Sequence, residues 1–160
     1  MRIGCVIDSS SIISLCKCEL ESFLGISEWK FICPNEVFRE VVEDGFAQGF
    51  IDAVAAKKLF DDRVIILTET RGEVPKNLST DGKVIELASE RKAMVLSNDP
   101  KLARKAVGRG IVALRSAGLC RFLAENGRIT KSQFKNAVML LVERNRLSEK
   151  NAEEYLKGVF

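Results

Sequence analysis

Short apolar segments recur along the chain, and each is followed by a stretch in which apolar residues have the spacing of a helix. The segments with the length and composition of strands are residues 2–7, 31–33, 64–67, 93–96 and 111–112. Strands that alternate with helices in this way form a parallel sheet with helices on both faces. The sequence therefore predicts an α/β fold with three layers, α/β/α, around a central parallel sheet.

The stretches between these strands predict helices. We expect them at residues 9–15, 20–24, 35–43, 46–60, 80–91 and 100–108. Gly45 is expected to interrupt the helical pattern between the third and fourth of these helices. The apolar side of the fourth helix would carry Phe50, Val54 and Leu59. Thr80 is expected to cap the fifth, and Pro100 suits the first turn of the sixth.

The end of the chain has a different pattern. Residues 116–125, 130–145 and 148–157 all have helical spacing, and Thr130 with Gln133 forms a capping-box signature. Phe134, Val138 and Leu141 make an apolar stripe on the middle helix. No flexible linker precedes these helices, so we expect residues 115–160 to be a helical extension packed on an α/β domain formed by residues 1–114.

Composition sets broad limits on the function. The 160 residues are 46% apolar and 29% charged, as in a globular domain, and the net charge of +3 permits a nucleic-acid partner without demanding one. No apolar run has the length of a membrane span and no secretory signal is visible, so we expect no membrane partner and a cytoplasmic location. The five cysteines have no zinc-site spacing and are expected to be small buried residues in a reducing compartment.

Four carboxylates stand where predicted strands and helices meet: Asp8, Glu40, Asp81 and Asp99. The functional crevice of a parallel sheet lies outside the carboxyl ends of its strands, and Asp8 and Asp99 both follow strands. The chain has no histidine, so its acid–base and metal chemistry must depend on carboxylates. Carboxylate oxygens favour hard ions such as Mg²⁺ or Mn²⁺.

Each of these acids also has a purely structural explanation. Asp8 and Asp99 stand where a helix favours an Asp cap, and Asp81 stands in a first turn, where negative charge suits the helix dipole. Glu40 lies beside other acids on a polar helix face. Asp8 is the hardest to explain in this way, because an ionised group at the end of a buried strand needs a partner.

Taken in order, the four acids resemble the motifs of the PIN-domain nuclease family. The segments that carry the resemblance are 7–13 (IDSSSII), 34–41 (PNEVFREV), 81–88 (DGKVIELA) and 96–103 (LSNDPKLA). In the second segment the acid after Pro-x-x-Val-x-x is Glu40. The helical end is similar to that of longer prokaryotic PIN-like proteins. Lys101 and Leu102 stand where the commonest pattern has a further Asp, and Gly82 is a poor helix former.

The resemblance implies a metal-dependent endoribonuclease, either a toxin of the toxin–antitoxin kind or an RNA-processing enzyme. Asp8, Glu40, Asp81 and Asp99 would hold Mg²⁺ or Mn²⁺, and two such ions can activate water and neutralise phosphate charge. The residues expected to contact the substrate are Ser10, Ser97, Lys101, Arg104 and Lys105. The serines could bind a carboxylate or the scissile phosphate, and the cations could bind flanking phosphates or simply form a solvated helix face. The partners expected are RNA, an antitoxin-like protein inhibitor and a second copy of the chain.

Other readings of the same residues remain open. A PIN-like module without catalytic activity would bind RNA or a protein. Haloacid-dehalogenase-type phosphatases carry Asp-x-Asp after the first strand, whereas Ser10 fills the second place here. Response-regulator receivers carry adjacent acids near the end of the first strand, whereas Ser9 stands beside Asp8. Both of these phosphoryl-transfer classes are disfavoured by the two serines.

Overall fold

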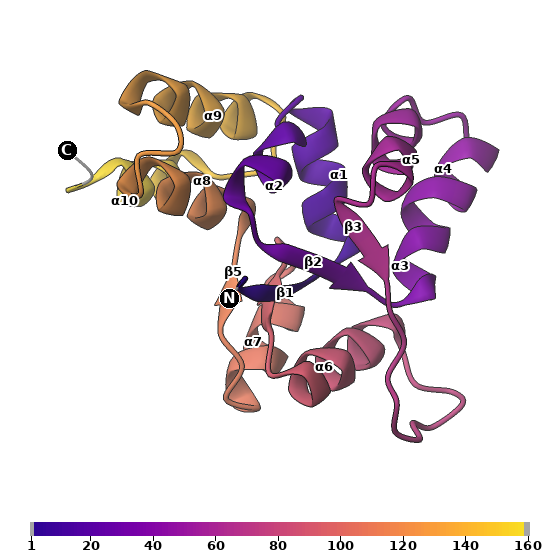
Figure 1. Ribbon diagram of the computed structural model, residues 1–160. Helices are drawn as coiled ribbons and strands as arrows, with labels where there is room; N and C mark the ends of the chain where they lie inside the picture. Colours follow the sequence, from indigo (N-terminus) through magenta and orange to yellow (C-terminus); the bar gives the residue numbers. More distant parts are fainter. Residues whose placement is uncertain (1, 159–160) are drawn as a thin grey trace.

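A five-stranded parallel sheet forms the centre of the computed structural model, which describes residues 2–158 (Figure 1). The strands are β1 (Gly4–Ile7), β2 (Lys30–Cys33), β3 (Ile65–Leu67), β4 (Met94–Leu96) and β5 (Ala113–Leu114). They lie in the order β3-β2-β1-β4-β5, and every pair is parallel. The α/β prediction is confirmed.

Helices cover both faces of the sheet. They are α1 (Ser9–Lys17), α2 (Ser22–Ser27), α3 (Asn35–Phe38), α4 (Asp44–Ala47), α5 (Asp52–Asp61), α6 (Thr80–Arg91), α7 (Pro100–Gly108), α8 (Ser116–Glu125), α9 (Lys131–Glu143) and α10 (Glu149–Leu156). Figure 1 shows α6 and α7 on one side of the sheet and α1, α5 and α8 on the other. The central strand β1 is apolar because it is covered from both sides, and Cys5, Val6 and Ile7 are fully buried.

The segment after β2 is one continuous helical rod. Between α3 and α4 the backbone widens into a π-helical turn, Arg39–Glu43. The prediction that Gly45 interrupts the helix is wrong, because Gly45 lies inside α4. A Cβ at this position would lie 2.9 Å from the Cβ of Ala53, so the glycine serves the close approach of α4 and α5.

The residues that helix α5 and the turn before it bury also differ from the prediction. The buried residues of α5 are Ala53, Ala56 and Leu59, whereas Phe50 and Val54 are exposed. The close packing on α4 selects small side chains, so hydrophobicity alone misidentified the buried face.

Two boundaries differ by one or two residues. Ser79, not Thr80, caps α6, and its hydroxyl accepts a hydrogen bond from the N–H of Gly82. The fifth strand is Ala113–Leu114 and not residues 111–112, because the N–H of Ile111 still bonds to the carbonyl of Ala106 and closes α7.

The C-terminal helices extend the core. Phe134, Val138 and Leu141 are buried as predicted, and the capping box of Thr130 and Gln133 is present. Helix α8 packs against α1 and α2, and α9 and α10 pack on α8. The division into an α/β domain and an extension at residue 114 stays a prediction.

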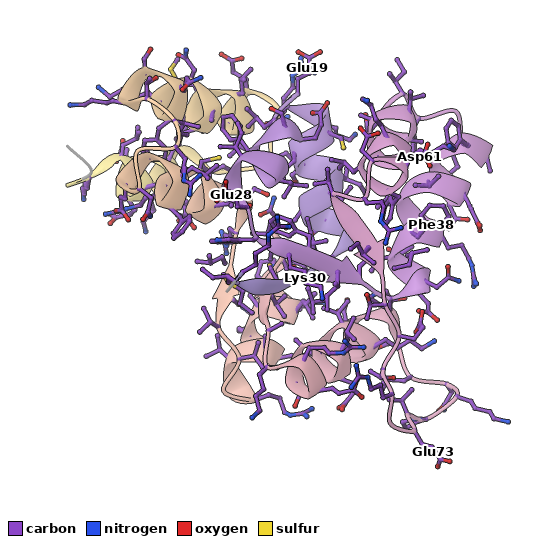
Figure 2. All side chains as sticks on the ribbon, viewed as in Figure 1. Glu19, Glu28, Lys30, Phe38, Asp61 and Glu73 are labelled. Atoms are coloured by element: carbon purple, nitrogen blue, oxygen red, sulfur yellow. The ribbon has the colours of Figure 1, made fainter. Side chains whose placement is uncertain are left out.

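Surface and core composition agree with the sequence. Charged side chains project from the surface, as Asp61 of α5 and Glu73 of the loop between β3 and α6 do in Figure 2. All five cysteines are buried and unbridged. Within residues 2–158, no helix combines the length and apolar character needed to cross a membrane.

Candidate metal centre

The four predicted acids lie around the carboxyl edge of the sheet. Asp8 follows β1 and caps α1, and Asp99 follows the neighbouring strand β4 and caps α7. Asp81 stands in the first turn of α6, and Glu40 lies in the π-helical turn. Strand ends and helix starts thus present carboxylates to one region, as a doubly wound sheet predicts.

Asp8 is the most buried of the four, with 5% of its surface exposed. Its carboxylate accepts hydrogen bonds from the Ser97 hydroxyl at 2.7 Å, the Ser10 hydroxyl at 2.8 Å and the Ser11 N–H at 3.2 Å. Burial raises the pKa of Asp8 to about 6, against the lowering effect of these hydrogen bonds, and the charge of Asp81 raises it further. No cation among the described residues pairs with this carboxylate, so its charge is only partly compensated.

The two serines hold the centre together. The Ser97 hydroxyl accepts the N–H of Asp99 at 3.0 Å while it donates to Asp8. The Ser10 hydroxyl likewise accepts the N–H of Asn98 at 2.9 Å. Both serines therefore bind the carboxylate and the β4–α7 turn together, whereas a contact with phosphate stays a prediction.

Asp81 and Glu40 face the same space. Burial raises the pKa of Asp81, the charges of Asp99 and Glu40 raise it too, and Lys105 lowers it. The Ser9 hydroxyl donates to Glu40 at 2.6 Å and ties the π-helical turn to the start of α1. Ser9 was not among the predicted site residues, although the run of three serines after Asp8 was a visible signal for such contacts.

The donor set suits a hard divalent cation, since the acids supply only carboxylate oxygens. Within residues 2–158, however, no three acidic or thiol side chains converge closely enough to hold a metal ion. The charge of Asp81 raises the pKa of Asp8, and the charges of Asp99 and Glu40 raise the pKa of Asp81, so the acids interact electrostatically.

The cations of α7 lie in different surroundings. Lys105 lies near enough to Asp81 to affect its pKa, and Lys101 is exposed on the first turn. Arg104 instead lines a separate hollow that it shares with Tyr155. The three predicted substrate cations therefore do not form a single patch.

An ion pair that the sequence did not indicate joins two of the acid-bearing elements. Lys83 of α6 donates to Glu36 of α3, and this hydrogen bond lowers the pKa of Glu36. Lys83 lies two residues after Asp81, and Glu36 lies four residues before Glu40. The pair therefore fixes the spacing of α3 and α6 beside the centre, and no local pattern could reveal a contact between residues 47 positions apart.

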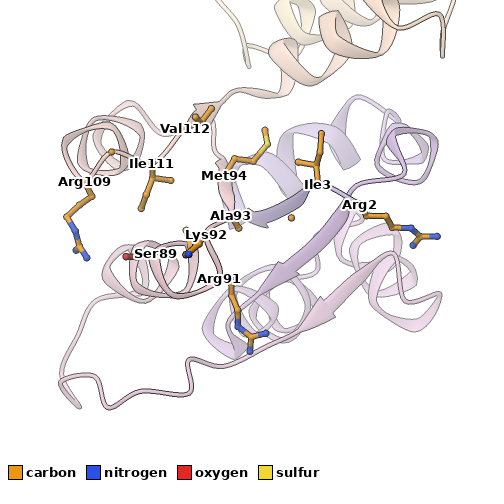
Figure 3. A pocket seen from close by; sticks show the side chains of 13 residues that line it. Arg2, Ile3, Ser89, Arg91, Lys92, Ala93, Met94, Arg109, Ile111 and Val112 are labelled. Carbon is orange, nitrogen blue, oxygen red and sulfur yellow. The ribbon is translucent and has the colours of Figure 1, made fainter.

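A larger hollow than those beside the acids lies elsewhere. It has a volume of about 880 Å³ and lies at the amino edge of the sheet, bordered by Arg2, Met94 and Ile111. Figure 3 shows the guanidinium groups of Arg2, Arg91 and Arg109 toward its outside, with Met94 and Ile111 nearer its middle. No carboxylate borders it, so it is not the site predicted from the acids.

Comparisons with known proteins agree with the fold and with the family resemblance. The family model DUF3368, described as a PIN domain, matches residues 4–159. A PilT N-terminus domain protein from the hyperthermophilic archaeon Sulfolobus solfataricus P2 has a similar structure, with a TM-score of 0.51 and 22% sequence identity. The similarity covers 73% of this chain and 90% of that one, and at this identity it shows the fold alone. Among curated proteins, no sequence matches the chain significantly.

Proposed function

The chain belongs to the PIN-domain family, and from that membership and its carboxylate site we propose that it is a Mg²⁺- or Mn²⁺-dependent endoribonuclease. The observation that carries the proposal is Asp8, a buried carboxylate bound by neutral donors beside Asp81 and Asp99. A protein that needed only a helix cap here would gain little from burying a charge without a cation. A divalent ion provides the missing compensation.

In this mechanism Asp8 would be the central metal ligand, and Asp81, Asp99 and Glu40 would complete the oxygen donors. A Mg²⁺ or Mn²⁺ ion held by these residues would activate water for attack and neutralise negative charge on the phosphate. Ser97 and Ser10 hold the Asp8 carboxylate in one orientation, as supporting side chains do around metal ligands. Lys105, beside Asp81, is positioned to attract a phosphate of the RNA.

A second candidate is a noncatalytic PIN-like module that binds RNA. It is favoured by the finding that, in the described part of the chain, no three potential ligands converge on one point. The metal dependence of RNA cleavage separates the two candidates.

The test is cleavage of single-stranded RNA with Mg²⁺ or Mn²⁺ and with excess chelator. We expect slow cleavage that requires the metal and leaves the products of water attack, since the chain has no histidine for 2′-hydroxyl chemistry. Asp8→Asn removes the central metal ligand and is expected to abolish cleavage. Asp62→Asn is the control, because Asp62 forms only a surface ion pair with Lys58. Cleavage that survives chelation would leave the RNA-binding module as the better description.

The biological role divides into a toxin held by an antitoxin-like protein and an RNA-processing enzyme. We propose both as alternatives within the same chemistry, with a second copy of the chain as a further partner. Growth arrest on expression, absent with Asp8→Asn, supports the toxin, and normal growth supports RNA processing. Light scattering of the purified chain measures whether it forms a dimer.

A further inference from the structure

A second hollow lies beside the metal centre, between α7, β5 and α10. Its volume is about 430 Å³, within the range of cavities that hold small organic molecules. Pro100 and Arg104 of α7 form one wall, Arg115 and Leu114 form another, and Tyr155 of α10 closes the third. The C-terminal helices therefore contribute directly to a cavity on the α/β part of the fold.

The hollow begins next to the candidate ligands. Pro100, in its wall, directly follows Asp99. The N–H of Ser97 bonds to the carbonyl of Leu114 at 2.8 Å, so the ends of β4 and β5 lie side by side. Arg115 borders this hollow and also a narrow gap with Asn98, the residue before Asp99. A group bound in the hollow would therefore lie close to a substrate phosphate at the metal centre.

The lining is cationic and aromatic. Neither Arg104 nor Arg115 forms an ion pair with a carboxylate among residues 2–158, and no acidic side chain borders the hollow. Tyr155 is half-buried, and its burial raises the pKa of the phenol while Arg115 and Arg121 lower it. An arginine side chain thus lies near the ring hydroxyl. Guanidinium groups bind phosphate, and an aromatic ring stacks on a nucleobase.

We propose that this hollow binds one nucleotide of single-stranded RNA next to the scissile phosphate, with its base against Tyr155 and its phosphate held by Arg104 and Arg115. The inference rests on the proposed function, because it takes RNA as the substrate. It assigns the C-terminal extension a role in substrate binding: α10 supplies the single tyrosine of the chain to the nucleotide site.

The test measures binding without cleavage. The 160-residue chain is titrated, in excess chelator, into a fluorescein-labelled octamer of uridine and into a matched octamer that lacks the bases. Tyr155→Leu keeps apolar contact with the core but removes the ring, and is expected to weaken binding of the uridine octamer about tenfold. Binding of the octamer without bases should not change, and Tyr155→Phe should bind both like the parent.

A second pair of variants tests the phosphate contact. Arg115→Gln is expected to weaken binding of both octamers and to reduce the salt dependence, whereas Lys135→Gln, an exposed cation on α9, leaves both unchanged. Melting temperatures confirm that each variant is folded.

The outcomes separate this inference from the nuclease proposal. Binding of the uridine octamer that is equal for the parent and Tyr155→Leu overturns the nucleotide site, even when the protein cleaves RNA. A tenfold loss with Tyr155→Phe overturns base stacking, since that variant keeps the ring. Ring-dependent binding by a protein that never cleaves RNA supports the nucleotide site and refutes the nuclease.

Discussion

The two edges of the sheet differ in what they can do. The amino edge holds the larger hollow, with an apolar middle and a basic rim, and two of its cations are paired: Arg109 with Glu86 at 3.0 Å and Arg91 with Glu90 at 3.4 Å. The carboxyl edge holds four carboxylates: the charge of Asp81 raises the pKa of Asp8, the charges of Asp99 and Glu40 raise the pKa of Asp81, and serine hydroxyls bind Asp8 and Glu40. The amino edge is therefore distinguished by the volume of its hollow, and the carboxyl edge by carboxylates whose charge is only partly compensated.

Backbone direction explains the difference. Helices α1 and α7 begin at the carboxyl edge, where their free N–H groups favour Asp8 and Asp99 as caps. Helix α6 ends at the amino edge with Arg91 and Lys92, where cations suit the negative end of the helix dipole. The basic rim thus has a sufficient structural explanation, whereas helix capping does not explain why Asp8 is buried without a cation.

The first prediction compares neutralised charges at the two edges, and the largest effect is expected at the carboxyl edge. Asp99→Asn is expected to lower the rate of RNA cleavage by at least about a thousandfold, since ligands of one metal centre act as a unit. The double variant Arg2→Gln, Lys92→Gln at the amino edge should cleave like the parent. Single-turnover kinetics with Mn²⁺ measure both. Loss of cleavage in the amino-edge variant would contradict the prediction that the reaction takes place at the carboxyl edge of the sheet.

A second prediction compares two ion pairs that involve the same helix. Lys83 and Glu36 lie near the metal centre with 23% and 25% of their side chains exposed, whereas Arg109 and Glu86 lie near the amino edge with 48% and 38% exposed. Lys83→Met is expected to lower metal affinity by about 10- to 100-fold, because the pair orients the elements that carry Glu40 and Asp81.

Arg109→Met is the matched control for this prediction. It breaks the exposed pair that links Glu86 of α6 to Arg109 at the end of α7, and such pairs contribute at most about 1 kcal/mol to stability. The metal affinity of both variants is measured from the melting temperature as Mg²⁺ or Mn²⁺ is titrated. Equal metal affinity for Lys83→Met and the parent would reduce the Lys83–Glu36 pair to a purely structural contact.

These comparisons also show what the sequence could and could not predict. Asp8 and Asp99 were identifiable because strand ends and helix caps are local features, and the parallel sheet then brings them together. The Lys83–Glu36 pair depends on how α3 and α6 pack, which no local pattern encodes. Phe50 and Val54 were misassigned to the core because hydrophobicity alone does not reveal that Gly45 and Ala53 bring α4 and α5 into close contact.

A third prediction concerns stability and pH. The folded protein holds a proton on Asp8 up to about pH 6, above the ordinary pKa of 3.8, so its stability should fall as pH rises between these values. The full effect corresponds to about 3 kcal/mol in the metal-free protein above pH 6. Asp8→Asn should remove this slope and be more stable than the parent at pH 7.5, with little difference below pH 3.8.

Urea unfolding in chelator between pH 3.5 and 7.5 measures this difference. Added Mg²⁺ or Mn²⁺ should stabilise the parent and not Asp8→Asn, because only the parent retains the central metal ligand. Glu86→Gln at the amino edge is the control and should change stability by less than about 1 kcal/mol. A parent that is more stable than Asp8→Asn at every pH without metal would show that the carboxylate is adequately compensated by its serines.

The smallest expected effect concerns Lys105 of α7, whose charge lowers the pKa of Asp81. Lys105→Ala removes one phosphate contact, so it should weaken RNA binding several-fold and reduce the slope of log affinity against log salt by about one. The maximal rate should be almost unchanged, because Lys105 attracts the substrate and does not hold the metal. Lys92→Ala at the amino edge should leave the slope as in the parent. Equal slopes for Lys105→Ala and the parent would mean that RNA reaches the carboxylates along another face. A slope that Lys92→Ala reduces as much as Lys105→Ala does would mean that RNA contacts both edges of the sheet.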